Sequence, residues 1–340
     1  MLVRNLEEGE MFGAITDVKG IYVGHASNFE ALTGCTVILC EEGAVGGVEI
    51  RGSAAGTRQL DALYPIHLVQ RVHALLLTGG SSFGLDAAAG VMRYLEERGK
   101  GFDVGITHIP IVPTAVIFDL ALGDHRVRPD AEMAYQACLH ASSAEVQEGS
   151  VGVGTGATVG KLFELKRACK GGVGTASVEG AGGIVVGALV VVNALGDVVD
   201  DRTGEILAGL REDEDGLRLV STAELLRKGI QKKKLGRPPM GNTTIGVVAA
   251  NVALNKEEVI KVAQMAHNGL AKTISPVNTT FDGDIIFALS AGEREAEVNN
   301  VGVMAETAIM EAVKRAVIRA DGFGILPAYK DLRSKKKITG

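Results

Sequence analysis

The stretch GNTTIGVVAAN, residues 241–251, marks an abrupt change in the character of the chain. Residues 211–242, which lead into this stretch and include its first two residues, hold an acidic run, a basic run and two adjacent prolines. This composition is typical of a linker. From Thr243 onward the sequence has the pattern of an apolar strand, with no turn in between. A flexible linker is therefore predicted to end directly at the first residue of a core strand.

Outward from this junction, apolar runs and amphipathic segments alternate along the chain. Apolar runs bounded by turn residues predict strands over 33–40, 72–80, 181–192 and 244–252. Apolar residues spaced by three and four predict helices over 85–98, 256–272 and about 306–320. Strands interleaved with helices favour a layered α/β fold, which we expect to form one domain over residues 1–340.

The composition limits the kinds of partner. A formal net charge of −6, 4% aromatic residues and no Trp provide neither a basic surface for nucleic acid nor an aromatic belt for a membrane. The longest apolar stretch, 181–196, is shorter than a membrane-spanning helix, and residues 1–12 lack the apolar core of a secretory signal. We expect a cytoplasmic protein that binds neither nucleic acid nor a membrane.

The cysteines and histidines show no spacing typical of a metal site. No CxxC pair occurs among the four cysteines, and no HExxH or HxxxH among the seven histidines. We therefore expect buried free thiols, no metal and no cofactor. The cysteines are Cys35, Cys40, Cys138 and Cys169.

One short motif suggests a serine nucleophile. Residues 80–84 read GSSFG, a G-x-S-x-G motif between a predicted strand and a predicted helix. On this interpretation Ser82 attacks the substrate and His267 is the downstream base. In a chain with 45 glycines, a Gly-rich turn from strand to helix also needs no catalytic explanation.

The glycine-rich segment 152–161 ends in Lys161 and reads GVGTGATVGK. It fails the Walker A pattern, because Thr155 stands where a glycine is needed and Leu162 where Ser or Thr is needed. It also lacks the setting of a dinucleotide-binding loop near the start of a βαβ unit. Lys161 is then either an ordinary lysine that reaches water or a buried cation.

Asp282 and Asp284 flank a single glycine just before the apolar run IIFAL. In a strand, two residues spaced in this way share a face. Two carboxylates on one face repel each other unless a cation or a hydrogen-bond donor faces them. The pair is therefore interpreted as a solvated turn or a metal-binding pair.

Read together, these segments resemble the L-aminopeptidase/D-esterase family, which includes the β-peptidyl aminopeptidases and the 6-aminohexanoate-oligomer (nylon-oligomer) hydrolases. The resemblance covers nearly the whole chain and implies a four-layer αββα sandwich similar to N-terminal nucleophile hydrolases. It further implies a precursor that cuts itself between Asn242 and Thr243, giving chains 1–242 and 243–340. The matching motifs are VGHASN (23–28), RGSAAGTRQLDALYP (51–65), LLLTGGSSFGLDAAAGVMRYLEERG (75–99), GVGTGATVGK (152–161), VVVNALGD (190–197), GNTTIGVVAAN (241–251) and FDGDIIFAL (281–289).

The resemblance also implies a role for each candidate residue. Thr243 becomes the nucleophile, and its new α-amine, with a pKa of about 7.7–8.0, acts as the base. Lys161 keeps that amine neutral, and Asn193 donates to the oxyanion. Asp282 and Asp284 orient the hydroxyl and the amine of Thr243. Family members work without a cofactor, and a homotetramer of processed heterodimers is implied.

Two positions differ from the aminopeptidase branch and bear on the substrate. Val116 and Phe118 stand in the region where that branch has an acidic residue and a tyrosine. An apolar wall here suits a methylene-rich acyl chain. An Asn before the Thr nucleophile and the D-G-D pair also resemble the nylon-oligomer branch. We expect peptides or ω-amino-acid oligomers such as 6-aminohexanoate oligomers as substrates.

Three other functions stay open at this stage. The first is an aminopeptidase or amidase that acts on D- or L-amino-acid amides and β-peptides. The second is an esterase that uses Ser82. The third is a non-catalytic binding protein that has kept the fold, although the five candidate catalytic residues are all of a suitable type.

Overall fold

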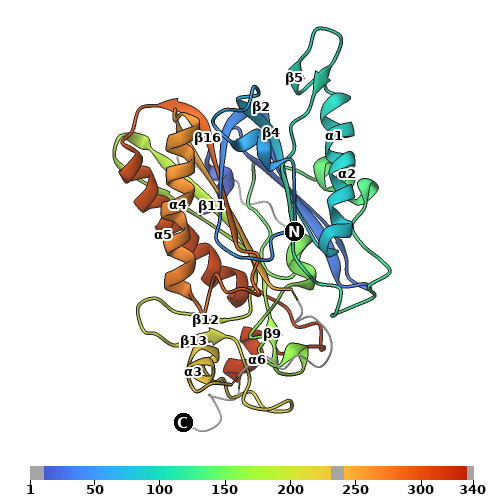
Figure 1. Cartoon of the computed structure of the whole chain (residues 1–340), viewed down its shortest axis with the longest axis vertical. Helices are drawn as coiled ribbons and strands as arrows, with labels where there is room; N and C mark the ends of the chain where they lie inside the picture. The colour runs from blue at the N-terminus through green and yellow to red at the C-terminus, as the bar shows by residue number, and fades with distance from the viewer. Residues whose placement is uncertain (1–10, 231–240, 335–340) are drawn as a thin grey trace.

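The computed structural model describes residues 11–230 and 241–334. Its main element is a mixed nine-stranded sheet with the strand order β10-β11-β14-β16-β2-β4-β7-β3, to which β1 adds by pairing with β2 (Figure 1). The strands are β1 (Tyr22–Asn28), β2 (Thr33–Ile50), β3 (Thr57–Arg58), β4 (Arg71–Thr78), β7 (Thr114–Val116), β10 (Gly172–Glu179), β11 (Val185–Asn193), β14 (Thr243–Val252) and β16 (Ile285–Arg294). The longer helices are α1 (Ala88–Glu96), α2 (Ala131–Leu139), α4 (Lys256–Thr273) and α5 (Val298–Ile318).

Strand β2 is 18 residues long and belongs to two layers of sheet. Its first half pairs with β1 and β4, whereas residues 45–50 pair with β16. On the β16 side, β10, β11 and β14 pair antiparallel to one another, and β14 and β16 run parallel. A long strand shared in this way lets the sheet turn and pack against itself.

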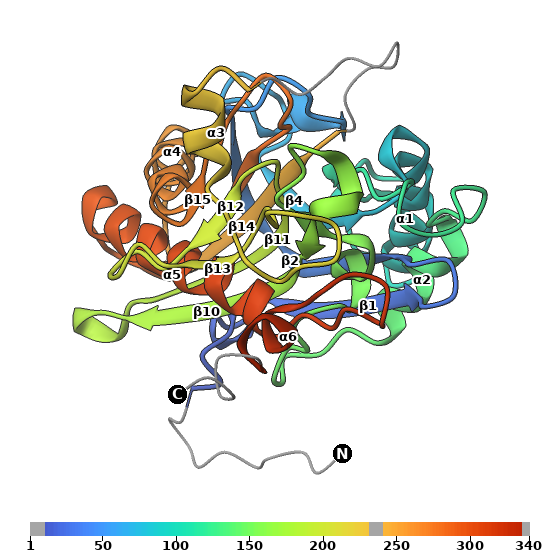
Figure 2. The ribbon, with the colours of Figure 1, turned by 90° about the horizontal axis from the view of Figure 1, so that it is seen from below.

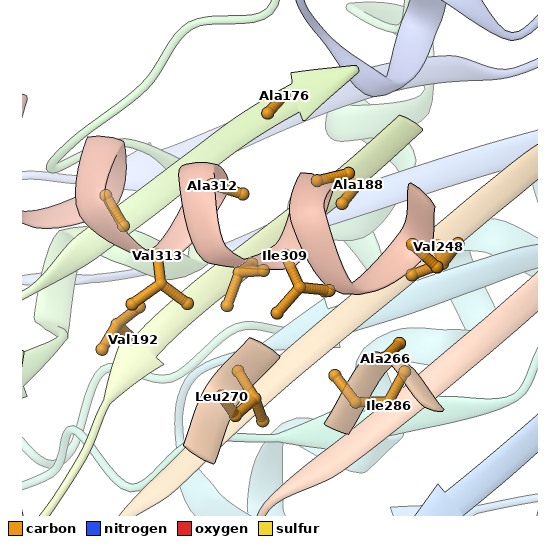
Figure 3. Close-up of a cluster of buried hydrophobic side chains, with 14 of the residues drawn as sticks. Ala176, Ala188, Val192, Val248, Ala266, Leu270, Ile286, Ile309, Ala312 and Val313 are labelled. Atoms are coloured by element: carbon orange, nitrogen blue, oxygen red, sulfur yellow. The ribbon is translucent and has the colours of Figure 1, made fainter. Parts of the chain in front are cut away.

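Three hydrophobic clusters lie between four layers of secondary structure. In the first, α4 and α5 pack on one face of β10, β11, β14 and β16, through residues such as Ile309 and Val248 (Figure 3). The second fills the space between the two sheet layers, with Leu75 and Phe287 among its members. The third holds α1 and α2 against the other face of β2 and β4. The predicted αββα sandwich is thus confirmed, and the two helix pairs lie on opposite sides of it (Figure 2).

Alternation along the strands explains this layering. In β11, Ala188 and Val190 point to the helices, whereas Leu189 and Val191 point into the space between the sheets. Both faces of such a strand are buried, which is why it has the continuous apolar sequence that identified it as a core strand.

Element ends differ from the predictions more than element types do. The segment predicted as one helix over 85–98 begins as a 3-10 helix, Ser81–Ala87, and only Ala88–Glu96 is α-helical. Helix α5 starts at Val298, eight residues before the predicted start. Gly302 weakens the helix signal of the sequence at this point, because glycine is a poor helix former. The same glycine lets α4 approach, since a Cβ on it would lie 2.3 Å from Met265 Sδ.

Part of the predicted linker is folded. Residues 222–227 form helix α3 (Thr222–Arg227), whose first residue donates its backbone N–H and its hydroxyl to the buried carboxylate of Asp197. Arg211 donates to the backbone carbonyls of Lys166 and Ala168. Residues 231–240 of the predicted linker lie outside the described residues.

Smaller elements complete the described part of the chain. They include β8 (Thr158–Val159), β9 (Cys169–Lys170), β12 (Asp197–Val199), β13 (Ile206–Ala208), β15 (Ile274–Ser275), the hairpin of β5 (Phe102–Asp103) and β6 (His108–Ile109), and α6 (Tyr329–Ser334). All four cysteines are buried free thiols, as predicted. No helix within residues 11–230 and 241–334 is long and apolar enough to cross a membrane.

The close contact between β10 and α5 gives a test of the packing. A Cβ on Gly174 would lie 2.2 Å from the backbone oxygen of Ala312 in α5, so Gly174→Ala should force the helix away from the sheet. We expect a loss of about 1–3 kcal/mol in the free energy of unfolding, measured by urea denaturation. Gly180→Ala is the matched control, because its Cβ would meet only the flexible end of Met304 in the same helix. Equal losses in both variants would contradict this account.

Candidate active site

Thr243 is the first residue of β14, a central strand of the sheet, and it is buried. Its hydroxyl donates to the carbonyl oxygen of Asn242 at 2.6 Å. The backbone N–H of Gly283 donates to the same oxygen at 2.7 Å. The carbonyl that precedes Thr243 is therefore polarised by one backbone donor and has the threonine hydroxyl beside it.

Asn193 ends β11 and lies directly opposite Thr243 in the antiparallel register. Its Oδ1 accepts from the backbone N–H of Thr158 at 3.0 Å and from Lys161 Nζ at 2.7 Å. Because both partners are donors, the orientation of the amide is fixed. Its Nδ2 donates to the Phe118 carbonyl at 3.1 Å, and a second hydrogen on that nitrogen remains to serve another acceptor.

Lys161 is buried, with 1% of its surface exposed, so it is not an ordinary lysine that reaches water. Besides Asn193 Oδ1, its ammonium donates to the Asn193 carbonyl at 2.9 Å. The residue before it, Gly160, has a positive φ of +74°, and a Cβ there would lie 2.1 Å from the carbonyl carbon of Gly209. The glycine-rich segment thus brings Lys161 into the interior by a turn that only glycine fits.

The acidic pair precedes strand β16 and does not lie within it. Asp282 forms a parallel bridge with Asn242, and both carboxylates are 1% exposed, which excludes a solvated turn. Asp282 accepts from the backbone N–H of Leu195 at 3.2 Å and from the N–H and hydroxyl of Thr279.

Asp284 accepts from the backbone N–H groups of Thr244 at 2.6 Å and Asn278 at 2.9 Å. Burial and, to a lesser extent, the nearby charge of Asp282 raise the pKa of Asp284 to about 7. In the described part of the chain, the hydrogen bonds of both carboxylates go to groups around Thr243 and not to its hydroxyl.

Residues 51–56 (RGSAAG) hold the acidic pair in place through backbone hydrogen bonds. The N–H groups of Arg51 and Gly52 donate to the carbonyl of Asp284, and that of Ala54 donates to the carbonyl of Asp282. A Cβ on Gly52 would lie 2.2 Å from the Asp284 nitrogen. The support consists of main-chain groups, so its role could not be predicted from side-chain chemistry, although the segment is one of the motifs that carry the family resemblance.

Phe118 lies at the candidate site, and Val116 lies at its margin. Phe118 lines a small cleft beside Lys161, and its Cβ is 3.1 Å from where a Cβ on Gly241 would be. Val116 is buried and packs against Gly56 of the supporting segment. The cleft is largely apolar but includes a carboxylate-bearing residue that the sequence analysis did not single out, Asp119. Its lining residues are Phe118, Asp119, Ala121, Leu122, Gly156, Thr158, Lys161, Leu165 and Gly241.

Ser82 and His267, the alternative catalytic pair, do not meet. Ser82 is exposed at the start of the 3-10 helix after β4. His267 is buried in α4, where its Nε2 contacts the Glu49 carbonyl at 3.0 Å and burial lowers its pKa to about 4. Within the residues that the structure describes, no group of three or more His, Cys, Asp or Glu side chains could hold a metal ion.

Sequence similarity to known proteins extends over most of this chain. The model of peptidase family S58 matches residues 13–326. A Mycobacterium tuberculosis protein described as an uncharacterized aminopeptidase is 42% identical over 94% of this chain and 97% of its own length. The 6-aminohexanoate-oligomer endohydrolase of a Kocuria species is 33% identical over 82% of this chain and 74% of its own length.

Solved structures share the fold at low sequence identity. The L-aminopeptidase D-Ala-esterase/amidase of Ochrobactrum anthropi, described as a variant of the Ntn hydrolase fold, has a TM-score of 0.71 at 21% identity and covers 99% of this chain and 96% of that one. A Burkholderia β-aminopeptidase has a TM-score of 0.66 at 23% identity over 99% of this chain and 97% of that one. The chain belongs to peptidase family S58 and is a hydrolase that acts on amide bonds.

Proposed function

We propose that this chain cuts itself between Asn242 and Thr243 and that the released Thr243 then hydrolyses amide substrates through an acyl-enzyme. The observation that carries the proposal is the placement of the Thr243 hydroxyl, 2.6 Å from the carbonyl oxygen of the peptide bond to be cut. The same oxygen already accepts a backbone N–H. Such a donor stabilises the charge that develops on this oxygen when the carbonyl carbon is attacked.

The cut begins when Thr243 Oγ bonds to the carbonyl carbon of Asn242 and gives its proton, through one water, to the Asp284 carboxylate, which later returns a proton to the departing nitrogen. The resulting oxyanion receives the Gly283 N–H, which already donates to that oxygen at 2.7 Å. The C–N bond then breaks, the departing nitrogen takes up a proton, and an ester joins Asn242 to Oγ. Water hydrolyses the ester, leaving a carboxylate on Asn242 and an α-amine on Thr243.

Turnover then uses the new α-amine as the base. In its neutral form the amine takes the proton from Oγ as Oγ attacks the substrate carbonyl. The remaining N–H of Asn193 Nδ2 donates to the substrate oxyanion. Lys161, fixed against Asn193, favours the neutral amine because two cations close together repel each other. Water finally releases the acyl group from Thr243.

The substrate class that we propose is a peptide or an ω-amino-acid oligomer such as a 6-aminohexanoate oligomer. The apolar side chains of Phe118, Leu122 and Leu165 line a cleft that is small in the intact chain, and they would suit methylene groups if the cleft widens after the cut. The name of the Kocuria relative points in the same direction. The mycobacterial relatives, described as aminopeptidases, favour the second candidate, an amino-acid amide or a β-peptide with a free amine.

Mass spectrometry and N-terminal sequencing test the cut directly. We expect fragments 1–242 and 243–340, the second beginning TTIGVV. Thr243→Ala should leave one intact, inactive chain because the attacking oxygen is gone, whereas Thr243→Ser should still be cut. Ser82→Ala should be cut and active. A processed, active Thr243→Ala protein would rule out the mechanism, and loss of activity in Ser82→Ala alone would favour the esterase.

The pH dependence of the first cut tests the acidic pair. Below about pH 7 Asp284 is mainly neutral, and above it the charged carboxylate can act as a general base that accepts the Thr243 proton through one water. The rate of precursor cleavage should therefore rise as the pH increases through about 7. Before the cut the nitrogen of Thr243 is an amide and not an amine, so it cannot produce the rise. Asp284→Asn should cleave at least tenfold more slowly and lose this rise. A rise with the same midpoint in the Asn variant would exclude Asp284 as its cause.

A panel of amides separates the two substrate classes. The processed enzyme should hydrolyse the linear 6-aminohexanoate trimer with a higher kcat/KM than D- or L-alanine amide, because the acyl side of the trimer is a methylene chain. The measurement is amine release followed by chromatography. Fast turnover of the alanine amides without turnover of the trimer would assign the enzyme to the aminopeptidase class.

A further inference from the structure

A second lysine is buried behind the candidate site, and the proposed mechanism does not use it. Lys170 lies in β9, opposite Thr158 of β8, and 1% of its surface is exposed. Its Nζ donates to the backbone carbonyls of Ala157 at 3.0 Å and Gly154 at 3.2 Å, with a longer contact of 3.5 Å to that of Gly171. Within residues 11–230 and 241–334, no carboxylate pairs with this ammonium.

The Ala157 carbonyl links Lys170 to the site through a single peptide group. The oxygen of that peptide accepts from Lys170, and its nitrogen, which belongs to Thr158, donates to Asn193 Oδ1 at 3.0 Å. The Thr158 hydroxyl donates to the same Oδ1 at 3.3 Å. The Gly171 N–H also donates to the Ala157 oxygen. A rotation of this peptide plane would break the contacts at both of its ends.

The ammonium also strengthens the bond that reaches Asn193. A cation that polarises a carbonyl oxygen makes the N–H of the same peptide a better donor. This effect is large where water is excluded, as it is around Lys170. The Asn193 amide would then be held with Oδ1 toward Thr158 and Lys161 and with Nδ2 toward the reacting carbonyl.

The surroundings of Lys170 allow it to be a cation near neutral pH. Burial lowers its pKa to about 7, while the carboxylates of Asp119 and Asp321 act in the opposite direction. Asp321 itself pairs with Lys330 at 2.7 Å. The Phe323 ring lies 5.7 Å from Nζ, within the range of a cation–π contact. Backbone carbonyls, two carboxylates at longer range and one ring therefore surround the charge.

We propose that Lys170 is a positioning residue which, through the Ala157–Thr158 peptide, holds the Asn193 amide in the orientation that stabilises the oxyanion. This rests on the proposed function of Asn193. Because Lys170 acts on the transition state and lies outside the cleft, its loss should lower kcat and leave KM nearly unchanged.

Lys256 provides a matched control. It too is a buried lysine whose ammonium donates to three backbone carbonyls, those of Ala62, Tyr64 and Val69. It begins α4, beyond the far end of β14, about 30 Å along the strand from Thr243. Lys256→Met therefore removes an equivalent set of hydrogen bonds at a distance from the reaction.

The kinetic test compares Lys170→Met with Lys256→Met on the amide that the wild-type enzyme hydrolyses fastest. Lys170→Met should lower kcat at least tenfold with KM within about twofold of the wild-type value, and Lys256→Met should leave both within about twofold. Thermal denaturation of each variant measures the loss of stability that follows from removing a buried lysine, which we expect in both variants. Equal kcat values in the two variants, or a change confined to KM, would overturn the proposal.

Hydrogen exchange gives a second readout that needs no turnover. Exchange of the Thr158 amide, followed by mass spectrometry of a fragment covering 152–161, should be at least tenfold faster in Lys170→Met than in the wild type and Lys256→Met. Unchanged exchange in Lys170→Met would exclude the positioning role. If the wild-type chain is neither cut nor active, the proposed function fails, and the exchange of Thr158 still decides whether Lys170 holds this peptide.

Discussion

The register between β11, β14 and β16 is the constraint on which the site depends. It places Asn193 opposite Thr243 and brings Asp284 to the start of the strand that runs parallel to β14. Side chains alternate along a strand, so a slip of one residue would turn Thr243 toward the other face and move Asn193 out of line. The register is fixed because both faces of β11 and β14 are buried in different apolar clusters. Core packing therefore determines the geometry of the polar site.

Burying several charged groups at one end of a sheet is costly, and main-chain groups provide most of the compensation. Asp282 and Asp284 are held largely by backbone N–H groups. Lys170 donates to backbone carbonyls, and Lys161 donates to both the backbone carbonyl and the side-chain oxygen of Asn193. A buried charge needs such partners, since its loss of hydration is otherwise uncompensated. Glycines let backbone segments approach closely enough to make these contacts. The chain has 45 glycines, which helps it to bury charged groups in this way.

This division between side chains and main chain explains what the sequence could predict. Apolar periodicity predicted the core strands and helices, whereas the roles expected for Thr243, Lys161 and Asn193 were implied by the resemblance to the family. The Gly283 N–H and the link from Lys170 to Asn193 could not be predicted, because one is a backbone group and the other depends on the pairing of β8 with β9. The start of α5 was placed too late because contact with α4, and not helix propensity, determines it.

The proposed mechanism assigns different oxyanion donors to its two reactions. In the intact chain the Asn242 oxygen already receives the Gly283 N–H, so this donor is preorganised for the cut. Asn193 Nδ2 donates to the carbonyl of Phe118, a residue that lines the cleft, and the proposal assigns its second N–H to the oxyanion of an external substrate. A change that disturbs only the Asn193 amide should therefore slow turnover more than the cut. In the proposed mechanism the same threonine oxygen would attack in both reactions, and the origin of the carbonyl would determine which donor stabilises the oxyanion.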